Sequence, residues 1–380
     1  MSTAFFVCAC LLHTRIVDQL KSFISSPVLW GMSLLFLLPL ISGLWSENKD
    51  EWLQNITIKL PLLLMPLSFA YSFNFAAKQW RWLAIIFVLL VTGGTIWGMY
   101  YYLIDFRTVH EGYLHARTIV TPLENDHVRF SWLISLSIII LGWLWWQTKK
   151  ETSAFWLYGI LIIYLVIFLH ILAARTGLLS FYVSVLFIAA RFIIKERKWT
   201  LSVGLVAAIV LLPTLAYFLF PTFHNRVKYF LYDFEYFKDA NYLPGGNDAT
   251  RVISIKTGLS IMLEHPMKGT GFGDITENMN RAYVSQHPSM QERDKIKPSS
   301  EWVVYGVGTG IPGILLFTFC ILTPFFARIK KKWEWWLLSI IVAASFLFDI
   351  GLEVQFGVFI YCFAVLSAWK SLNIETERPK

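Results

Sequence analysis

Two consecutive apolar stretches decide the fold of this chain: residues 154–173 read AFWLYGILIIYLVIFLHILA, and residues 176–194 read TGLLSFYVSVLFIAARFII. Each approaches the roughly 20 apolar residues that a helix needs to cross a bilayer. Neither stretch alternates polar and apolar residues, so both predict helices and not the strands of a barrel. Only Ala174 and Arg175 separate them, which predicts a short turn between two membrane-spanning helices.

Similar stretches recur throughout the 380 residues, of which 56% are hydrophobic and 15% charged, whereas soluble domains carry about 25% charged residues. We therefore predict an all-α integral membrane protein, a polytopic bundle of about ten transmembrane helices that forms a single membrane domain over residues 1–380. The predicted spans are residues 27–45, 58–76, 82–104, 128–147, 154–173, 176–194, 200–220, 303–326, 334–349 and 353–369. The short apolar run over residues 4–12 is not interpreted as a cleaved signal peptide, because it lacks a preceding basic region and a cleavage site.

Lys and Arg side chains gather on one side of these ten spans. They are Arg15, Lys21, Lys78, Arg81, Lys149, Lys150, Arg191, Lys195, Arg197, Lys198, Arg328, Lys330, Lys331, Lys332, Lys370, Arg378 and Lys380. Because short cytoplasmic loops carry an excess of such residues, we assign this side to the cytoplasm. The net charge of +8 then reflects topology and not nucleic-acid binding. The opposite side receives one large extracytoplasmic (periplasmic) loop, residues 221–302.

Arginines on the predicted outer side are the main candidates for function. Arg175 opens the sixth span on the side that is otherwise poor in positive charge, which favours a functional role over an interfacial anchor. Arg251 follows the helix breakers at 244–246, where a guanidinium and the free N–H groups of a helix start can bind an anion. The alternative for Arg251 is a solvated arginine paired with Asp248. Arg117, in the second outer loop, is either an anion ligand or an ordinary polar residue.

The large loop has distinct parts. Residues 224–242 are aromatic and charged, and they predict a partly amphipathic segment at the membrane interface. Asp248 and Thr250 are candidate caps for a helix over about 251–264. The glycines at 269, 271 and 273 have no strand before them and no phosphate-binding lysine after them, so they predict a tight turn with close backbone approach. A polar stretch follows, residues 278–298.

Four short motifs share the predicted outer side. They are Trp45-Ser46, Arg175-Thr176-Gly177, the block from Arg251 to Gly273 with His265-Pro266, Gly269 and Gly271, and Gly310-Ile311-Pro312-Gly313. In order and spacing they resemble the O-antigen ligase/polymerase superfamily of bacterial membrane proteins. The resemblance covers about residues 170–313, together with the layout of the spans.

One position departs from the family pattern. Family members often carry a histidine eleven residues before the first glycine of the terminal Gly-x-x-Gly motif, and here that position is Ser299. Glu301 and His287 are the nearest residues that can replace it as a base. Their structural alternatives are a carboxylate that the helix dipole favours at a helix start, for Glu301, and an ordinary loop histidine, for His287.

The resemblance implies a metal-independent, inverting glycosyltransferase that moves a glycan from an undecaprenyl-diphosphate carrier to a hydroxyl acceptor, lipid-linked or protein, outside the plasma (inner) membrane. In this scheme Arg117, Arg175 and Arg251 bind the diphosphate, and Arg175 and Arg251 stabilise the charge of the leaving group. Glu301 or His287 deprotonates the acceptor. No cofactor is expected, and the four cysteines, in or beside apolar runs, have no zinc spacing.

Other functions stay open at this point. A ligase transfers a finished glycan to an acceptor, whereas a polymerase joins repeat units on the carrier, and no residue separates the two. A lipid or solute transporter is the alternative from another class. It would need broken helices and charged groups near the middle of the membrane, and the predicted spans carry almost none of the latter.

Overall fold

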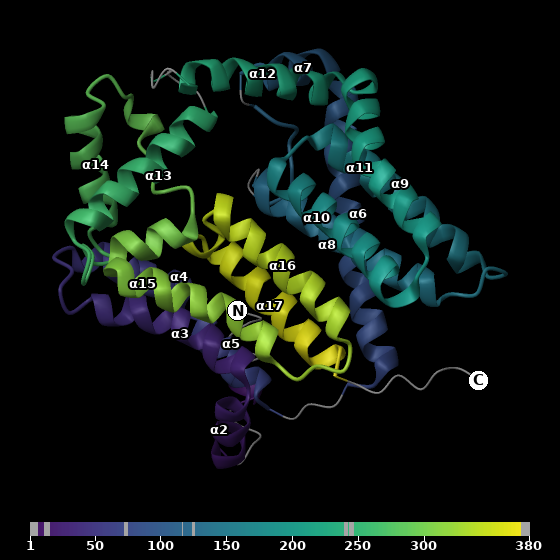
Figure 1. The fold of residues 1–380 in the computed structure, drawn as a ribbon, viewed down its shortest axis with the longest axis horizontal. Coiled ribbons are helices and arrows are strands. Elements are labelled where there is room, and N and C mark those ends of the chain that lie inside the picture. The colour runs from purple at the N-terminus through teal and green to yellow at the C-terminus, as the bar shows by residue number, and fades with distance from the viewer. Residues whose placement is uncertain are drawn as a thin grey trace. The chain divides into compact units, whose positions relative to one another are not determined.

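The computed structural model describes residues 7–10, 16–71, 75–115, 117–123, 126–238, 242 and 247–373, and every regular element among them is a helix. The chain divides into two compact units, Met1–Ala77 with Ala249–Lys380, and Lys78–Asp248. Figure 1 shows their helices, coloured along the chain. Several predicted features lie wholly or partly outside the described residues. They are the ends of the apolar run 4–12, residues 72–74 of the span 58–76, residues 239–241 of the aromatic segment 224–242, the helix breakers 244–246, and the basic residues Arg15, Arg378 and Lys380.

The first unit combines helices from both ends of the chain. They are α2 (Ile16–Ser25), α3 (Pro27–Ser42), α4 (Lys49–Lys59), α5 (Pro61–Phe69), α13 (Asn247–Glu264, apart from its first two residues), α14 (Ile275–Gln286), α15 (Glu301–Phe326), α16 (Lys332–Phe348) and α17 (Gln355–Ser371), with short 3-10 turns η2 (Glu292–Asp294) and η3 (Gly351–Glu353). The helix α3 packs along α15 (Figure 1). Gly31 lies directly on Thr323, and the Tyr305 hydroxyl donates to the Leu35 carbonyl at 2.8 Å. Small residues at such contacts let helices approach closely in a membrane.

The second unit is a continuous run of helices. They are α6 (Ala77–Ile104), α7 (Phe106–Tyr113), α8 (His127–Gln147), α9 (Ser153–Leu172), α10 (Arg175–Arg191) with a π-helical end η1 (Phe192–Glu196), α11 (Trp199–Leu219) and α12 (Pro221–Lys238). The helix α8 packs against α9 and α10. The helix α12 packs on α7 and α9, where Thr222 donates to the Ile171 carbonyl at 2.7 Å and Asn225 donates to the His110 carbonyl at 2.9 Å.

Six helices among the described residues are long and apolar enough to cross a membrane. They are α6, α8, α9, α10 extended to Glu196, α11 and α15. The pair α2 and α3, bent by 92°, raises the number to seven if it forms one span. The prediction of an all-α chain with several membrane-spanning helices is confirmed, whereas the count of about ten is not. The other predicted spans correspond to shorter helices, and the span 58–76 is divided because α4 ends at Lys59 and α5 begins at Pro61.

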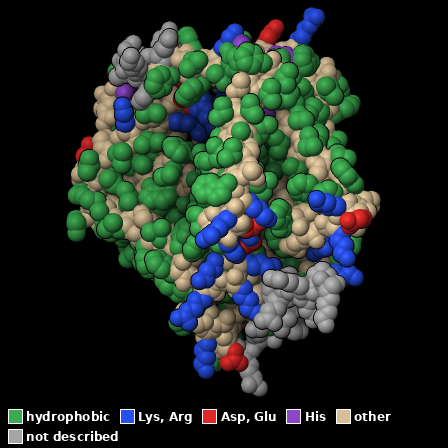
Figure 2. All heavy atoms as spheres, turned by 45° about the vertical axis from the view of Figure 1, so that its right-hand side comes forward, with side chains coloured by type: hydrophobic (Ala, Val, Ile, Leu, Met, Phe, Trp, Pro, Cys, Tyr) green, Lys and Arg blue, Asp and Glu red, His purple; other side chains and the backbone are tan. Residues whose placement is uncertain are grey.

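Large apolar side chains remain exposed on the predicted spans. Examples are Leu90 on α6 and Val210 and Phe218 on α11. Hydrophobic side chains also cover much of the face shown in Figure 2. Soluble proteins rarely expose apolar surface on this scale, whereas lipid tails cover it without cost.

The segment 221–302 is rich in helices, and the two units divide it. The aromatic segment 224–242 falls largely on α12, in the second unit, while α13, α14 and the start of α15 belong to the first. The helix predicted over about 251–264 is present and begins earlier, at Asn247. The polar stretch 278–298 contains most of α14, a helix that its polar residues did not indicate.

Candidate functional site

Arg175 is placed by the sharp turn that connects α9 and α10. Ala173 adopts left-handed backbone angles, with φ at 49°, and α10 begins at Arg175 itself. Its guanidinium forms an ion pair with Asp248 and lies over the ring of Phe230, with 5.3 Å between the guanidinium carbon and the ring centroid. The arginine that the sequence analysis selected is therefore held between a carboxylate and an aromatic face.

The glycine of the Arg175-Thr176-Gly177 motif fixes α10 against α8. A Cβ at Gly177 would lie 2.5 Å from the Cβ of Ser131. Because glycine has no Cβ, the helices approach closely enough for two hydrogen bonds. The Gly177 N–H donates to the Ser131 hydroxyl at 3.1 Å, and the Ser135 hydroxyl donates to the Gly177 carbonyl at 2.6 Å. Because these contacts lie within one turn of Arg175, they determine where its backbone stands.

Asp248 was a predicted cap of α13, but in the structure it has other partners. Its carboxylate pairs with Arg175, and its backbone N–H donates to the carboxylate of Asp233 at 2.5 Å. Asp233 is fully buried on α12. The first turn of α13 therefore receives its carboxylate partner from another helix, a contact that no local sequence pattern indicates.

Arg251, in the first unit, lies one helical turn before Ser254, which contacts Ser299. Its guanidinium donates to the Phe348 carbonyl at the end of α16, at 3.2 Å. One turn later the hydroxyl of Ser254 lies 3.2 Å from that of Ser299, and it accepts the Ser299 N–H at 3.1 Å. Ser254, one turn after Arg251, is thus the residue that contacts Ser299, and the Asp248 carboxylate pairs with Arg175.

Glu301 begins α15 two residues after Ser299 and is fully buried. Its Oε1 accepts the N–H of Leu352, in η3, at 2.5 Å. Within the described part of the chain its Oε2 has no hydrogen-bond partner. A buried carboxylate oxygen without a partner is costly, so this atom is a candidate for contact with a ligand or a proton.

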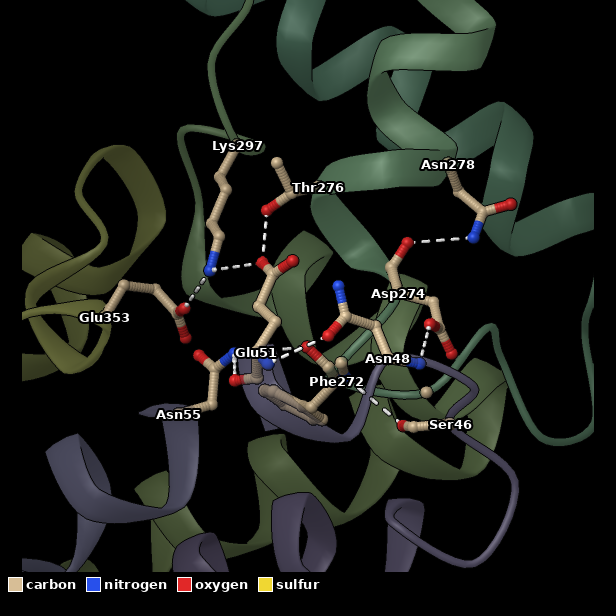
Figure 3. A network of polar contacts seen from close by, with 12 residues as sticks. Ser46, Asn48, Glu51, Asn55, Phe272, Asp274, Thr276, Asn278, Lys297 and Glu353 are labelled. Carbon is tan, nitrogen blue, oxygen red and sulfur yellow. Dashed lines mark hydrogen bonds and ion pairs between the residues drawn. The ribbon is translucent and has the colours of Figure 1, made fainter. Parts of the chain in front are cut away.

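An ionic cluster that sequence reasoning missed lies on the other side of η3. Lys59, at the end of α4, forms a buried ion pair with Glu353 and donates to the Leu352 carbonyl at 2.8 Å. Lys297 bridges Glu353 and Glu51, with N–O distances of 3.1 and 3.7 Å (Figure 3). The available signal was a lysine and a glutamate next to apolar spans, where ionisable residues are rare and usually paired.

The pKa values of Glu353 and Lys297 both shift in the direction that favours their charged forms. Burial raises the pKa of Glu353, but the charges of Lys59 and Lys297 outweigh burial and place it below its usual range. Burial lowers the pKa of Lys297, and the Glu353 carboxylate more than compensates. A cluster of this kind fixes η3, and with it the Leu352 N–H that covers Glu301.

The Gly-rich turn at residues 269–273 supplies hydrogen-bond partners for the backbone where α15 is interrupted. Gly310 interrupts that helix with φ at 73° and ψ at −162°, and Pro312 has no N–H to donate. The exposed backbone groups are satisfied from the turn: Thr270 and Gly271 donate to the carbonyls of Val307 and Gly308 at 2.8 and 3.0 Å, and Ile311 donates to the Pro266 carbonyl at 2.8 Å. Non-helical backbone within a membrane protein requires such internal partners.

The same turn is fastened to the corner between α3 and α4. The carboxylate of Asp274 accepts the N–H groups of Glu47 and Asn48, at 2.8 and 2.9 Å, and the hydroxyl of Ser46 accepts the Gly273 N–H at 3.2 Å (Figure 3). Gly271 packs directly on Ser46. The prediction of a tight turn with close backbone approach is confirmed, and three of the four sequence motifs meet at this point.

Replacing Gly310 with Ala should destabilise the protein. The backbone angles at Gly310 are almost restricted to glycine, which costs other residues about 1–3 kcal/mol, and a Cβ would lie 2.5 Å from the Pro266 carbonyl. We expect a clearly lower melting temperature of the purified protein in detergent. Gly204→Ala is the control, because a Cβ there meets nothing within 4 Å. Equal melting temperatures of the two variants would show that the break is not constrained as described.

The two remaining candidates lie apart from these contacts. Arg117 is exposed in the second unit, where its backbone N–H donates to the Gly112 carbonyl at 2.9 Å. His287 ends α14 in the first unit and is half-buried, and its N–H donates to the Tyr283 carbonyl at 2.8 Å. Arg251, Ser299 and Glu301 are the predicted positions that the first unit brings together, whereas Arg175 belongs to the second unit.

Comparison with known families gives a match to part of the chain. Residues 160–318 match the family described as O-antigen ligase, and this segment contains Arg175, Arg251 and Glu301. A comparison with curated proteins finds no match.

Proposed function

The match over residues 160–318 supports membership of the O-antigen ligase/polymerase superfamily, and from this premise we propose that the chain transfers a glycan from an undecaprenyl-diphosphate carrier to a hydroxyl acceptor. Members of this family are glycosyl-transferring enzymes that act on lipid-linked glycans. The observation that best supports the proposal is in the first unit, where Ser254, one turn after Arg251, contacts Ser299, and Glu301 follows two residues later.

The proposed reaction is a direct displacement. The acceptor oxygen forms a bond to the anomeric carbon, the bond from that carbon to the diphosphate oxygen breaks, and undecaprenyl diphosphate leaves with the electron pair. Arg175 and Arg251, with Arg117 as a further ligand, balance the charge that develops on the leaving group. Because the diphosphate is a good leaving group, no metal is needed, and a single displacement inverts the anomeric centre.

Glu301 is the better proposed base of the two candidates. It lies two residues from the position that carries histidine in the family, and its Oε2 has no hydrogen-bond partner within the described residues. His287 ends α14, where its described contacts are with backbone groups of Tyr283 and Met290. Glu301 is fully buried, so an acceptor hydroxyl reaches its Oε2 only when the residues that cover it move, while the Leu352 N–H holds Oε1.

Replacing Glu301 with Gln should slow transfer by roughly 10²–10⁴-fold, the usual contribution of a general base. The amide keeps the size of the side chain but cannot accept a proton, so the pH dependence of the residual rate should also lose its acidic limb. Initial rates with a lipid-linked glycan across a pH series provide the measurement. His287→Gln is the matched variant, and a larger loss in that variant than in E301Q would transfer the role of base to the histidine.

The proposed setting is the plasma (inner) membrane, with about ten spans and the segment 221–302 on the outer side. The basic residues of the short loops support this orientation. Reporter fusions after Lys150 and within 278–298 should report opposite sides of the membrane. A cytosolic position of the second fusion would separate the proposed site from the carrier lipid and contradict the proposal.

We propose that the chain acts as a ligase, and polymerisation of repeat units is the alternative function. A deletion strain distinguishes them through its cellular glycans. Acceptor molecules that lack the long glycan indicate a ligase, and acceptors that carry single repeats indicate a polymerase. Unchanged glycans would contradict both.

A further inference from the structure

We propose that Asp248 is a specificity-determining residue that keeps singly charged phospholipid headgroups away from Arg175 and yields to a doubly charged lipid diphosphate. This inference rests on the proposed function, because it takes Arg175 as a ligand of the carrier diphosphate. It concerns a carboxylate that neither the family resemblance nor the proposed reaction uses.

The ion pair places the carboxylate where a ligand would bind. Arg175 opens α10, and its side chain is 40% exposed, whereas that of Asp248 is 14% exposed. The ring of Phe230 supports one face of the guanidinium. A ligand that arrives at this arginine therefore meets an accessible cation that already carries an anionic partner.

The backbone of Asp248 is anchored independently of its side chain. The Asp248 N–H donates to Asp233 at 2.5 Å, and Asp233 is fully buried. Rotation of the Asp248 side chain can therefore release Arg175 without moving α13. The displaced carboxylate would still lie in the first turn of α13, where the helix dipole favours negative charge.

The charges of the competing ligands determine which of them displaces Asp248. A phospholipid phosphodiester carries one negative charge, so exchanging it for the Asp248 carboxylate leaves the charge beside Arg175 unchanged and gains little. A diphosphate diester carries two negative charges and more acceptor oxygens, so the same exchange strengthens the contacts of the guanidinium. Arg226, one turn before Phe230 on α12 and nearly buried, adds a second cation on that side of the helix.

This selectivity matters because of where the protein works. Phospholipids surround a membrane protein in large excess over any carrier lipid. An arginine at the membrane surface without a competing carboxylate would be occupied by their phosphates through the same charge-assisted hydrogen bonds.

The test uses the full-length purified protein in mixed micelles of phosphatidylcholine with increasing phosphatidylglycerol, with an undecaprenyl-diphosphate-linked glycan as substrate. For the wild type, KM should change less than about twofold as phosphatidylglycerol increases. For Asp248→Asn in phosphatidylcholine alone, KM should fall by roughly 10-fold, because one charge-assisted contact no longer has to be broken. Phosphatidylglycerol should then raise the KM of this variant again.

Two further variants make the result specific. Asp248→Ser removes the charge but keeps a side chain that can hydrogen-bond at a helix start, so it should behave as D248N does. Asp126→Asn disrupts another carboxylate–arginine pair of the second unit, in which Asp126 and Arg129 are 3.4 Å apart, and it should leave KM unchanged.

The opposite result would overturn the inference. If D248N and D248S both raise KM or lower kcat, and neither becomes sensitive to phosphatidylglycerol, Asp248 only positions Arg175. Arg175→Ala separates this outcome from failure of the proposed function. An inactive R175A with an unresponsive D248N rejects the inference alone, whereas a fully active R175A rejects the proposed function.

Discussion

Replacing Arg251 with Ala should lower the rate of glycan transfer by about 10²–10³-fold, the usual cost of removing one donor that stabilises charge in a transition state. Arg251 is partly exposed, and its guanidinium donates to the Phe348 carbonyl, so we expect the variant to fold and enter the membrane. Transfer to the acceptor, measured with equal amounts of purified protein, gives the ratio of rates. Because the lost charge acts mainly on the leaving diphosphate, kcat should fall more than KM rises.

Two further variants test whether the effect is specific to Arg251. Arg251→Lys keeps the charge but loses bidentate hydrogen bonding, so it should recover only part of the rate. Arg281→Ala removes another arginine of the first unit, which forms an exposed pair with Glu277 on α14, and it should transfer glycan at the wild-type rate. Equal losses in R251A and R281A would mean that Arg251 has no special role.

Replacing Lys59 with Met should destabilise the protein by about 3–5 kcal/mol, the cost of removing one partner from a buried ion pair. The side chains of Lys59 and Glu353 are 0% and 3% exposed, so water cannot replace the missing ammonium group. Glu353 keeps Lys297 as a partner but loses the closer of its two cations. A large fall in melting temperature in detergent is the expected observation.

The double variant Lys59→Met, Glu353→Met provides the control for this prediction. With both charges removed, position 353 no longer leaves a buried carboxylate without its Lys59 partner, and much of the stability should return. If K59M alone melts at the wild-type temperature, the ion pair between Lys59 and Glu353 does not stabilise the position of η3. If the double variant is less stable than K59M, Glu353 has contacts that outweigh its pairing with Lys59.

The fold class could be predicted from the sequence because the length of an apolar stretch is a local property of the chain. The stretches around 154–194 became α9 and α10, and the turn between them placed Arg175 at a helix start. Marginal lengths were harder to interpret: α3, α16 and α17 have 16 or 17 residues, and a proline divides α4 from α5. A length criterion alone cannot decide whether such helices span a membrane, since tilt and local thinning compensate for a few residues.

The candidate site was predicted in part. The motifs containing Ser46, Gly271 and Gly310 were recognised in the sequence. Their shared role, to bind the backbone of a broken helix, depends on contacts between distant residues, such as Ser46 and Gly273, which are 227 positions apart. The partners of the two arginines were also missed. Asp248 was assigned as a cap or as a partner of Arg251, and nothing in the local sequence links it to Arg175.

The burial of charged side chains was not predicted, for a related reason. Almost no ionisable residue was predicted within the spans, and Lys59, Glu301 and Glu353 all stand at or beside the ends of predicted spans. The structure buries all three, through packing of α4, η3 and the start of α15. Burial at a helix end depends on what covers that end, which the amphipathic pattern of a single helix does not contain.

The most direct test of the account is turnover of an undecaprenyl-diphosphate-linked glycan by the purified, detergent-solubilised protein in the presence of a metal chelator. We predict release of undecaprenyl diphosphate in step with glycan transfer to the acceptor, and loss of both products in the variant Arg175→Ala, Arg251→Ala. Unchanged turnover by that double variant, or no turnover by the wild-type protein with any hydroxyl acceptor, would contradict the account.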